Sequence, residues 1–182
     1  TVRLTVGDKA LTENVEVALD PALEFSRADL ESQLTASLRV RDLVSTLHVA
    51  IQTLDGLEQQ TENLQETIRL SLADVPEELT AALDGLLDKI NEHRKTVVRR
   101  ETPTYGTATK LLGKLRGWSR GIDSANAAPT KYQLEYVDKL QAEHGVAIGE
   151  TNRIVREEVP AVNEILKRHN LPTLLASEVT SP

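Results

Sequence analysis

The residues of this chain that could do chemistry are concentrated in one basic segment, residues 93–122. That segment has a net charge of +7 at neutral pH, whereas the rest of the chain has −14. A cationic segment with aromatic rings nearby is typical of a surface that binds an anionic polymer. The candidate contact residues are Arg94, Lys95, Arg99, Arg100, Lys110, Lys114, Arg116, Trp118 and Arg120.

A second interpretation of the basic segment is structural. The cations would neutralise the acidic helices against which the segment packs, because helices of soluble proteins commonly mix charges on one face. Trp118 would then be a core anchor rather than a platform for stacking. Binding to a polyanion weakens steeply as salt rises, so a salt titration separates the two interpretations. The polymer would be either nucleic acid or an acidic polysaccharide, and of the two we expect the acidic polysaccharide as a partner.

Other kinds of site find no support in the sequence. The absence of cysteine excludes disulfides, zinc–thiolate sites and thiol nucleophiles. None of the four histidines follows a glutamate by three positions, the spacing that di-metal sites in helical bundles require. Glu77 and Glu78 are adjacent, and neighbours on a helix point about 100° apart, so they cannot flank one bond. Glu157 and Glu158 fail for the same reason. We therefore expect no catalytic residues, metal or cofactor here.

The composition indicates which elements must position the basic segment. Aromatic residues make up only 3% of the chain, so a core has to be built from aliphatic side chains, which suits helices. A charged fraction of 27% and a net charge of −7 are typical of a folded acidic protein. No apolar run approaches the roughly 20 residues that cross a bilayer, so no membrane span is expected.

The first 21 residues predict a β-hairpin. Val2, Leu4 and Val6 alternate with polar residues, residues 7–9 favour a turn, and a second alternating run follows at residues 15–19. Asp20-Pro21 would end it, because proline cannot extend a central strand. An isolated hairpin is marginal in water, so its apolar face must lie on the helices, on another copy or on further strands. We favour further strands and interpret the hairpin as the remnant of an upstream β-domain.

From Ser26 onward the apolar residues recur every three or four positions. This period predicts one amphipathic helix of about 45 residues, capped by Ser26 and Asp29 and weakest at Gly56. Such a helix would be roughly 65–70 Å long, so partner helices must run beside it. A second helix should begin near residues 74–78, with a proline in its first turn, and end at residues 102–104.

Two further helices complete the predicted bundle. A short one should contain Leu111 to Trp118, and a long one should start at the Thr130/Gln133 capping box. Pro160 should kink or interrupt the long helix near residue 157, and residues 170–172 should stop it. The fold class is therefore mainly α: an antiparallel bundle of three long helices and a short one over residues 26–172. The hairpin, residues 1–21, precedes it, and a frayed, flexible tail, residues 173–182, follows.

Several stretches of the chain resemble one family. They are Ala-Asp-Leu-Glu at 28–31, the run at 38–50, Asp-Ser-Ala-Asn-Ala-Ala-Pro-Thr at 123–130, and Val-Pro-Ala-Val-Asn-Glu-Ile-Leu at 159–166 followed by Leu-Pro at 171–172. They are similar to the C-terminal helical region of large bacterial proteins with BNR (Asp-box), sortilin-like β-propellers, often labelled glycosyl hydrolases. The strands before Asp20-Pro21 resemble the small β-domain of the same family.

The resemblance implies a secreted or periplasmic parent with this chain as its C-terminal module. The Asp-box repeats are not in these residues, so no catalytic residue is carried over. We expect a non-catalytic accessory module that packs on the upstream β-propeller part of the same parent chain or mediates assembly, for example as a homodimer. One alternative is a bundle that lines the cleft of a polysaccharide-active glycosyl hydrolase with residues 93–122. The other is a free-standing polyanion-binding bundle.

Overall fold

The computed structural model describes residues 1–16, 18, 26–71, 74–98, 109–124 and 127–180. A small N-terminal hairpin of β1 (Val2–Val6) and β2 (Lys9–Glu13) precedes the helices. The helices are α1 (Arg27–Ser71), α2 (Glu77–Val97), α3 (Leu111–Asp123), α4 (Lys131–Arg153), the π-helical segment η1 (Ile154–Glu158) and α5 (Val159–Arg168). The predicted fold class, a mainly α bundle behind a hairpin, is confirmed.

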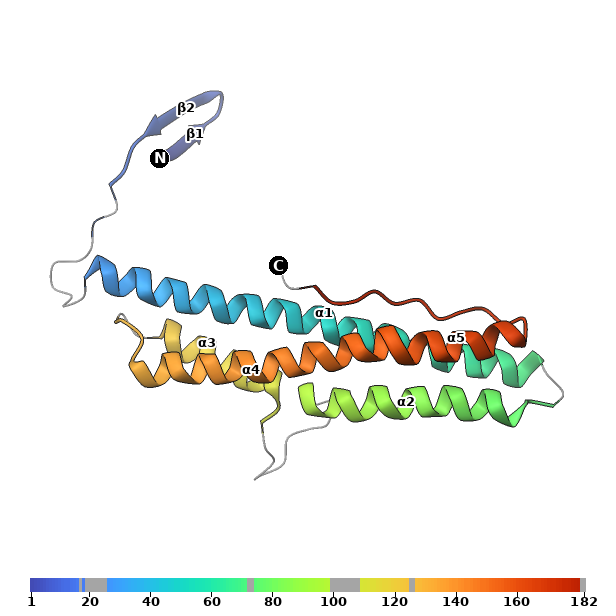
Figure 1. Ribbon diagram of the computed structural model, residues 1–182. Helices are drawn as coiled ribbons and strands as arrows, with labels where there is room; N and C mark the ends of the chain where they lie inside the picture. Colours follow the sequence, from blue (N-terminus) through green and yellow to red (C-terminus); the bar gives the residue numbers. More distant parts are fainter. Residues whose placement is uncertain (17, 19–25, 72–73, 99–108, 125–126, 181–182) are drawn as a thin grey trace.

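The first long rod of the bundle is α1. At its start the Asp29 carboxylate accepts from the Ser26 N–H at 2.8 Å, while the Asp29 N–H donates to the Ser26 hydroxyl at 3.2 Å. The Ser26 N–H and the Ser26 hydroxyl both donate to the Asp29 carboxylate and lower its pKa. The helix continues without interruption through Gly56 for 45 residues, as the periodicity predicts, and it spans the length of the bundle (Figure 1).

The second long rod is continuous from α4 through η1 to α5. It begins with the predicted capping box of Thr130 and Gln133. Pro160 has no N–H to give to the preceding turn, and the chain widens into the π-helical turn η1 directly before it. The rod ends at Asn170, which adopts a φ of 56°, and the Leu171 N–H returns to the Leu166 carbonyl at 3.0 Å. The disturbance predicted near residue 157 is present as a π-helical turn that does not break the rod, and the predicted stop is present at Asn170.

The third layer of the bundle is divided between two shorter helices. One, α2, packs on the C-terminal half of α1 and on α5, whereas α3 packs on the N-terminal half of α1 and on α4 (Figure 1). The core is divided in the same way. An α3-side core contains Leu47, Leu115 and Leu140, and an α2-side core contains Leu83 and Ile154.

The start of α2 differs slightly from the prediction. Pro76 is the N-cap residue of α2 and precedes the first turn, and its carbonyl accepts from the Leu79 N–H at 3.0 Å. The helix ends at Val97, and the predicted end at residues 102–104 lies outside the described residues. Among the helices that the structure describes, none is long and apolar enough to cross a membrane.

The second strand of the hairpin begins earlier than the sequence predicts, and the predicted end at Asp20-Pro21 lies outside the described residues. Leu4 pairs with Leu11 and Val6 with Lys9, so the turn contains only Gly7 and Asp8. Gly7 adopts a φ of 58°, which glycine reaches without steric cost. The prediction that the second strand starts at Val15 was wrong, because a turn of two residues lets the second strand begin at Lys9. Within the described residues neither strand contacts a helix, and the hairpin lies apart from the bundle (Figure 1).

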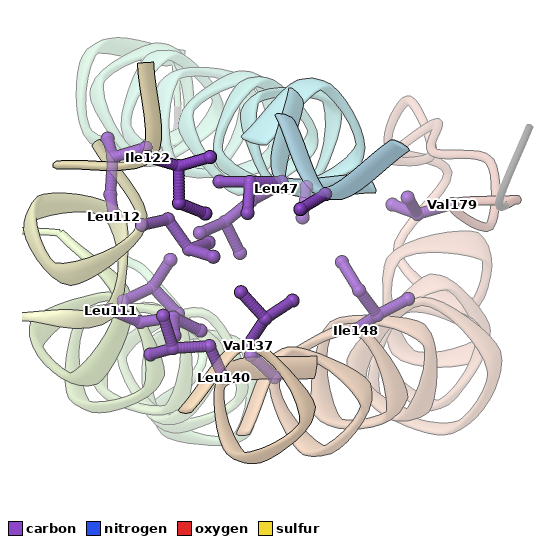
Figure 2. Close-up of a cluster of buried hydrophobic side chains, with 14 residues drawn as sticks. Leu47, Leu111, Leu112, Ile122, Val137, Leu140, Ile148 and Val179 are labelled. Atoms are coloured by element: carbon purple, nitrogen blue, oxygen red, sulfur yellow. The ribbon is translucent and has the colours of Figure 1, made fainter. Parts of the chain in front are cut away.

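The C-terminal segment, residues 173–180, differs from the frayed tail that the sequence predicts. It runs in an extended conformation along α1, α4 and α5, and Leu174 and Val179 are buried. Figure 2 shows Val179 across the α3-side core from Leu111 and Leu112. The segment therefore closes the side of the bundle that α2 and α3 leave uncovered.

Candidate functional site

Arg94, the first cation of the basic segment, is buried. It lies in the last turn of α2 and is only 3% exposed. Its guanidinium binds both carboxylate oxygens of Glu58, with one distance of 2.6 Å, and the Asp55 carboxylate at 3.0 Å. These two acids on α1 raise the pKa of Arg94. Arg94 ties α2 to α1 and does not belong to an open surface.

The other described cations of the segment lie nearer the surface. Lys95 pairs with Glu92 at 2.6 Å, within α2. Lys114 on α3 pairs with Glu143 on α4 at 2.7 Å, and this bond raises the pKa of Lys114. Arg116 lies beside the His48 ring nitrogen at 2.8 Å. Arg120 is exposed and Lys110 is half-buried. Arg99 and Arg100 lie outside the described residues.

Trp118 packs between α3 and the start of α4. Its ring centroid lies 4.3 Å from that of Tyr136 and 6.1 Å from that of Tyr132. The indole N–H donates to the Gln133 carbonyl at 3.3 Å, and the ring packs against the α3-side core. Tyr132 is exposed at the edge of this cluster. The cluster fixes α3 against α4 and presents one aromatic ring to solvent.

A buried histidine lies between the two cores. The Nε2 atom of His93 is 3.0 Å from the Thr151 hydroxyl, and burial lowers the pKa of His93. His93 also lines a cavity of about 450 Å³ together with Glu143 and Glu150. Glu150 is bound by Arg153 and Glu143 by Lys114, so both carboxylates already have cationic partners. No group of three His, Cys, Asp or Glu side chains in the described part of the chain could hold a metal ion.

The tail lies in a groove that sequence reasoning missed. Three carboxamide side chains on the helices bind the main chain of the tail, each through two hydrogen bonds. The pairs are Asn163 with Leu174, Gln60 with Leu175, and Asn152 with Val179. One signal could have indicated the groove: Asn152 and Asn163 are 11 positions apart, about three helical turns, and so share one face.

Comparisons with known proteins identify no relative of this chain. No protein-family model, curated protein or solved structure matches it. Its function has to be inferred from its own surfaces. Those surfaces are the exposed face of the hairpin, the cationic face of α3 and the groove that holds the tail.

Proposed function

We propose that this chain is a non-enzymatic interaction module that joins a larger exported protein through its β-hairpin. The observation that supports this function is one face of the hairpin with four exposed apolar side chains, where only Lys9 and Glu13, the partners of Val6 and Val2, are charged. Val2, Leu4 and Val6 on β1 and Leu11 on β2 point to the same side, because Leu4 and Leu11 are direct partners. These four side chains are between 57% and 70% exposed.

The hairpin face calls for a β-rich partner. A two-stranded hairpin has little stability in water without a surface on which to bury its apolar side chains. Both strands are also edge strands, with main-chain N–H and C=O groups available to a further strand. The upstream β-propeller part of the same parent chain, which the BNR resemblance suggests, would supply both the strands and the apolar surface. The helical bundle would then be carried as an accessory or assembly unit.

Co-elution with the upstream part tests this function. We expect the chain to elute together with the separately expressed upstream part, with light scattering reporting the summed mass. Leu4→Lys with Leu11→Lys should abolish the complex, because both changes place charge on the apolar face. The matched control is Thr5→Lys with Ala10→Lys, which places the same two charges on the opposite face, because Thr5 and Ala10 are direct partners. A chain that stays separate, or a complex that survives the leucine changes, would contradict the proposal.

A second candidate function is binding of an acidic polysaccharide by α3, either free-standing or in the cleft of a glycosyl hydrolase. Arg116 and Arg120 are exposed on α3, and Tyr132 offers an exposed ring at the neighbouring helix. Alanine at Arg99, Arg100, Arg116 and Arg120 should remove binding, and any turnover by the parent, while the helical content stays unchanged. Binding that is insensitive to salt, or unchanged turnover in the folded variant, would exclude this candidate.

A further inference from the structure

The groove holds the tail by its main chain. Each of the three carboxamides, Asn163, Gln60 and Asn152, donates to the carbonyl and accepts from the N–H of one tail residue, at 2.7–3.0 Å. A neighbouring strand pairs with a residue in the same way. These hydrogen bonds thus recognise an extended backbone and do not depend on the side chains of the paired residues.

The spacing of the amides matches an extended peptide. Asn152 and Asn163 are separated by 11 residues of helical rod, about 16 Å. Their partners, Val179 and Leu174, are separated by five residues of extended chain, also about 16 Å. The tail runs antiparallel to the rod, so the outer pairs are in register along its length. The outer amides therefore fit an extended peptide that places two residues five positions apart.

The side chains of the tail add a simple specificity. Leu174 is 3% exposed and enters the α2-side core, and Val179 is 4% exposed and enters the α3-side core beside Leu47 and Ile148 (Figure 2). Leu175 points outward and is 76% exposed. The ligand of this groove is therefore an extended peptide with small aliphatic residues five positions apart.

We propose that the groove is a peptide-binding site that accepts residues 174–179 of a second copy of this chain in place of its own. This segment is the one ligand that the structure itself demonstrates to fit. All the groove amides and both apolar sites belong to the helices, so an exchanged tail makes every contact that the resident tail makes. The change of path is confined to residues 171–173, beyond the turn at Asn170. Two copies would thus exchange tails reciprocally, about a two-fold axis.

The short connection between α5 and the tail explains why tail exchange is unfavourable in the unmodified chain at low protein concentration. A short connection gives the resident tail an effective concentration of about 1 mM, so a second copy at micromolar concentration competes poorly. Exchange becomes favourable when the resident tail is weakened or the protein is concentrated. The inference does not depend on the proposed function of the hairpin, because it uses the groove on the helical bundle alone.

A pair of complementary variants of the full chain tests the proposal. The first has Leu174→Ser and Val179→Ser, which weaken its tail and leave its groove intact. The second has Gln60→Ala, Asn152→Ala and Asn163→Ala, which weaken its groove and leave its tail intact. We expect each variant alone to be monomeric, and the mixture to contain a 1:1 complex of twice the mass by light scattering. Folded variants, verified by circular dichroism, that form no complex would overturn the proposal.

A labelled peptide with the sequence of residues 172–180 keeps the test independent of complex formation. Fluorescence anisotropy should show saturable binding to the first variant. Binding should fall at least tenfold when Asn152→Ala and Asn163→Ala are added to it. Gln59→Ala, which removes an exposed amide next to Gln60 on α1, should leave binding unchanged. Equal binding to all three proteins, or to a peptide with serine at both apolar positions, would also overturn the proposal.

Discussion

Two arginines of the same basic segment lie in different regions of the molecule. Arg94, at the end of α2, is buried against Glu58 and Asp55 of α1, whereas Arg116 is exposed on α3 beside His48. A charged side chain leaves water only when partners are already positioned for it. Like charges that are clustered in a sequence therefore need not form one surface in the folded protein. The helix that each residue belongs to decides whether its charge stabilises the fold or is available to a ligand.

The largest effect should follow removal of the buried cation. Arg94→Ala leaves the Glu58 carboxylate buried without its main partner, so we expect the free energy of unfolding to fall by about 3–5 kcal/mol. Urea denaturation followed by circular dichroism measures it. The double variant with Glu58→Ala should lose less than the two single losses combined, because the charge left behind is removed as well. A loss below about 1 kcal/mol for Arg94→Ala would contradict the structural role of this arginine.

The buried and exposed faces of α3 allow the same contrast to be tested at two adjacent residues. Leu115 is fully buried in the α3-side core, and its neighbour Arg116 is exposed. Leu115→Ala should lower the free energy of unfolding by about 2–5 kcal/mol, since it leaves a cavity between α1, α3 and α4. The same denaturation experiment gives the value. Equal effects of Leu115→Ala and Arg116→Ala would mean that α3 does not present distinct buried and exposed faces.

The groove amides should have an intermediate effect. Asn163→Ala removes both partners of the Leu174 main chain, so we expect a loss of about 1–3 kcal/mol and faster amide hydrogen exchange in the tail. Gln59→Ala is the control, because it removes an exposed amide from α1. Unchanged exchange at Leu174 in the Asn163 variant would show that the amide does not hold the tail.

The buried histidines make stability depend on pH. Burial lowers the pKa of both His93 and His144 below the ordinary 6.5, so the unfolded chain takes up protons first as the pH falls. Stability should therefore be full above about pH 6.5 and decline as the pH falls below it. Urea midpoints at about pH 7.5 and 5.5 measure the decline. His93→Gln with His144→Gln should flatten it, and an unchanged slope would place its origin in other groups.

The smallest effect on stability is expected at the exposed face of α3. Arg116→Ala and Arg120→Ala should each change the free energy of unfolding by no more than about 0.5 kcal/mol. The same variants should weaken binding to an acidic polysaccharide, and reduce its salt dependence, if this face is used as a ligand surface. A large loss of stability at either position would remove the contrast with Arg94.

Much of the fold is predictable from local chemistry. Thr130 and Gln133 mark the start of α4 because each side chain satisfies a main-chain group of the same turn. Pro160 predicts the disturbed turn before it because it has no N–H, and Asn170 predicts the end of α5 because asparagine tolerates a positive φ. The hairpin strand after Gly7 was misplaced because alternation alone does not reveal where a two-residue turn returns the chain.

The helices of this protein follow from local signals in the chain: the capping residues, the spacing of apolar residues, the helix stops and the aliphatic composition of the core. Their signals act within a few residues, so no folded context is needed to interpret them. Other features depend on how the helices pack together. These are the burial of Arg94, the packing of Trp118 on Tyr136 and the groove that holds residues 173–180. The partners of these residues are between 11 and 115 positions away in the chain. Their roles follow from which helix faces meet, and one-dimensional spacing contains little of that information.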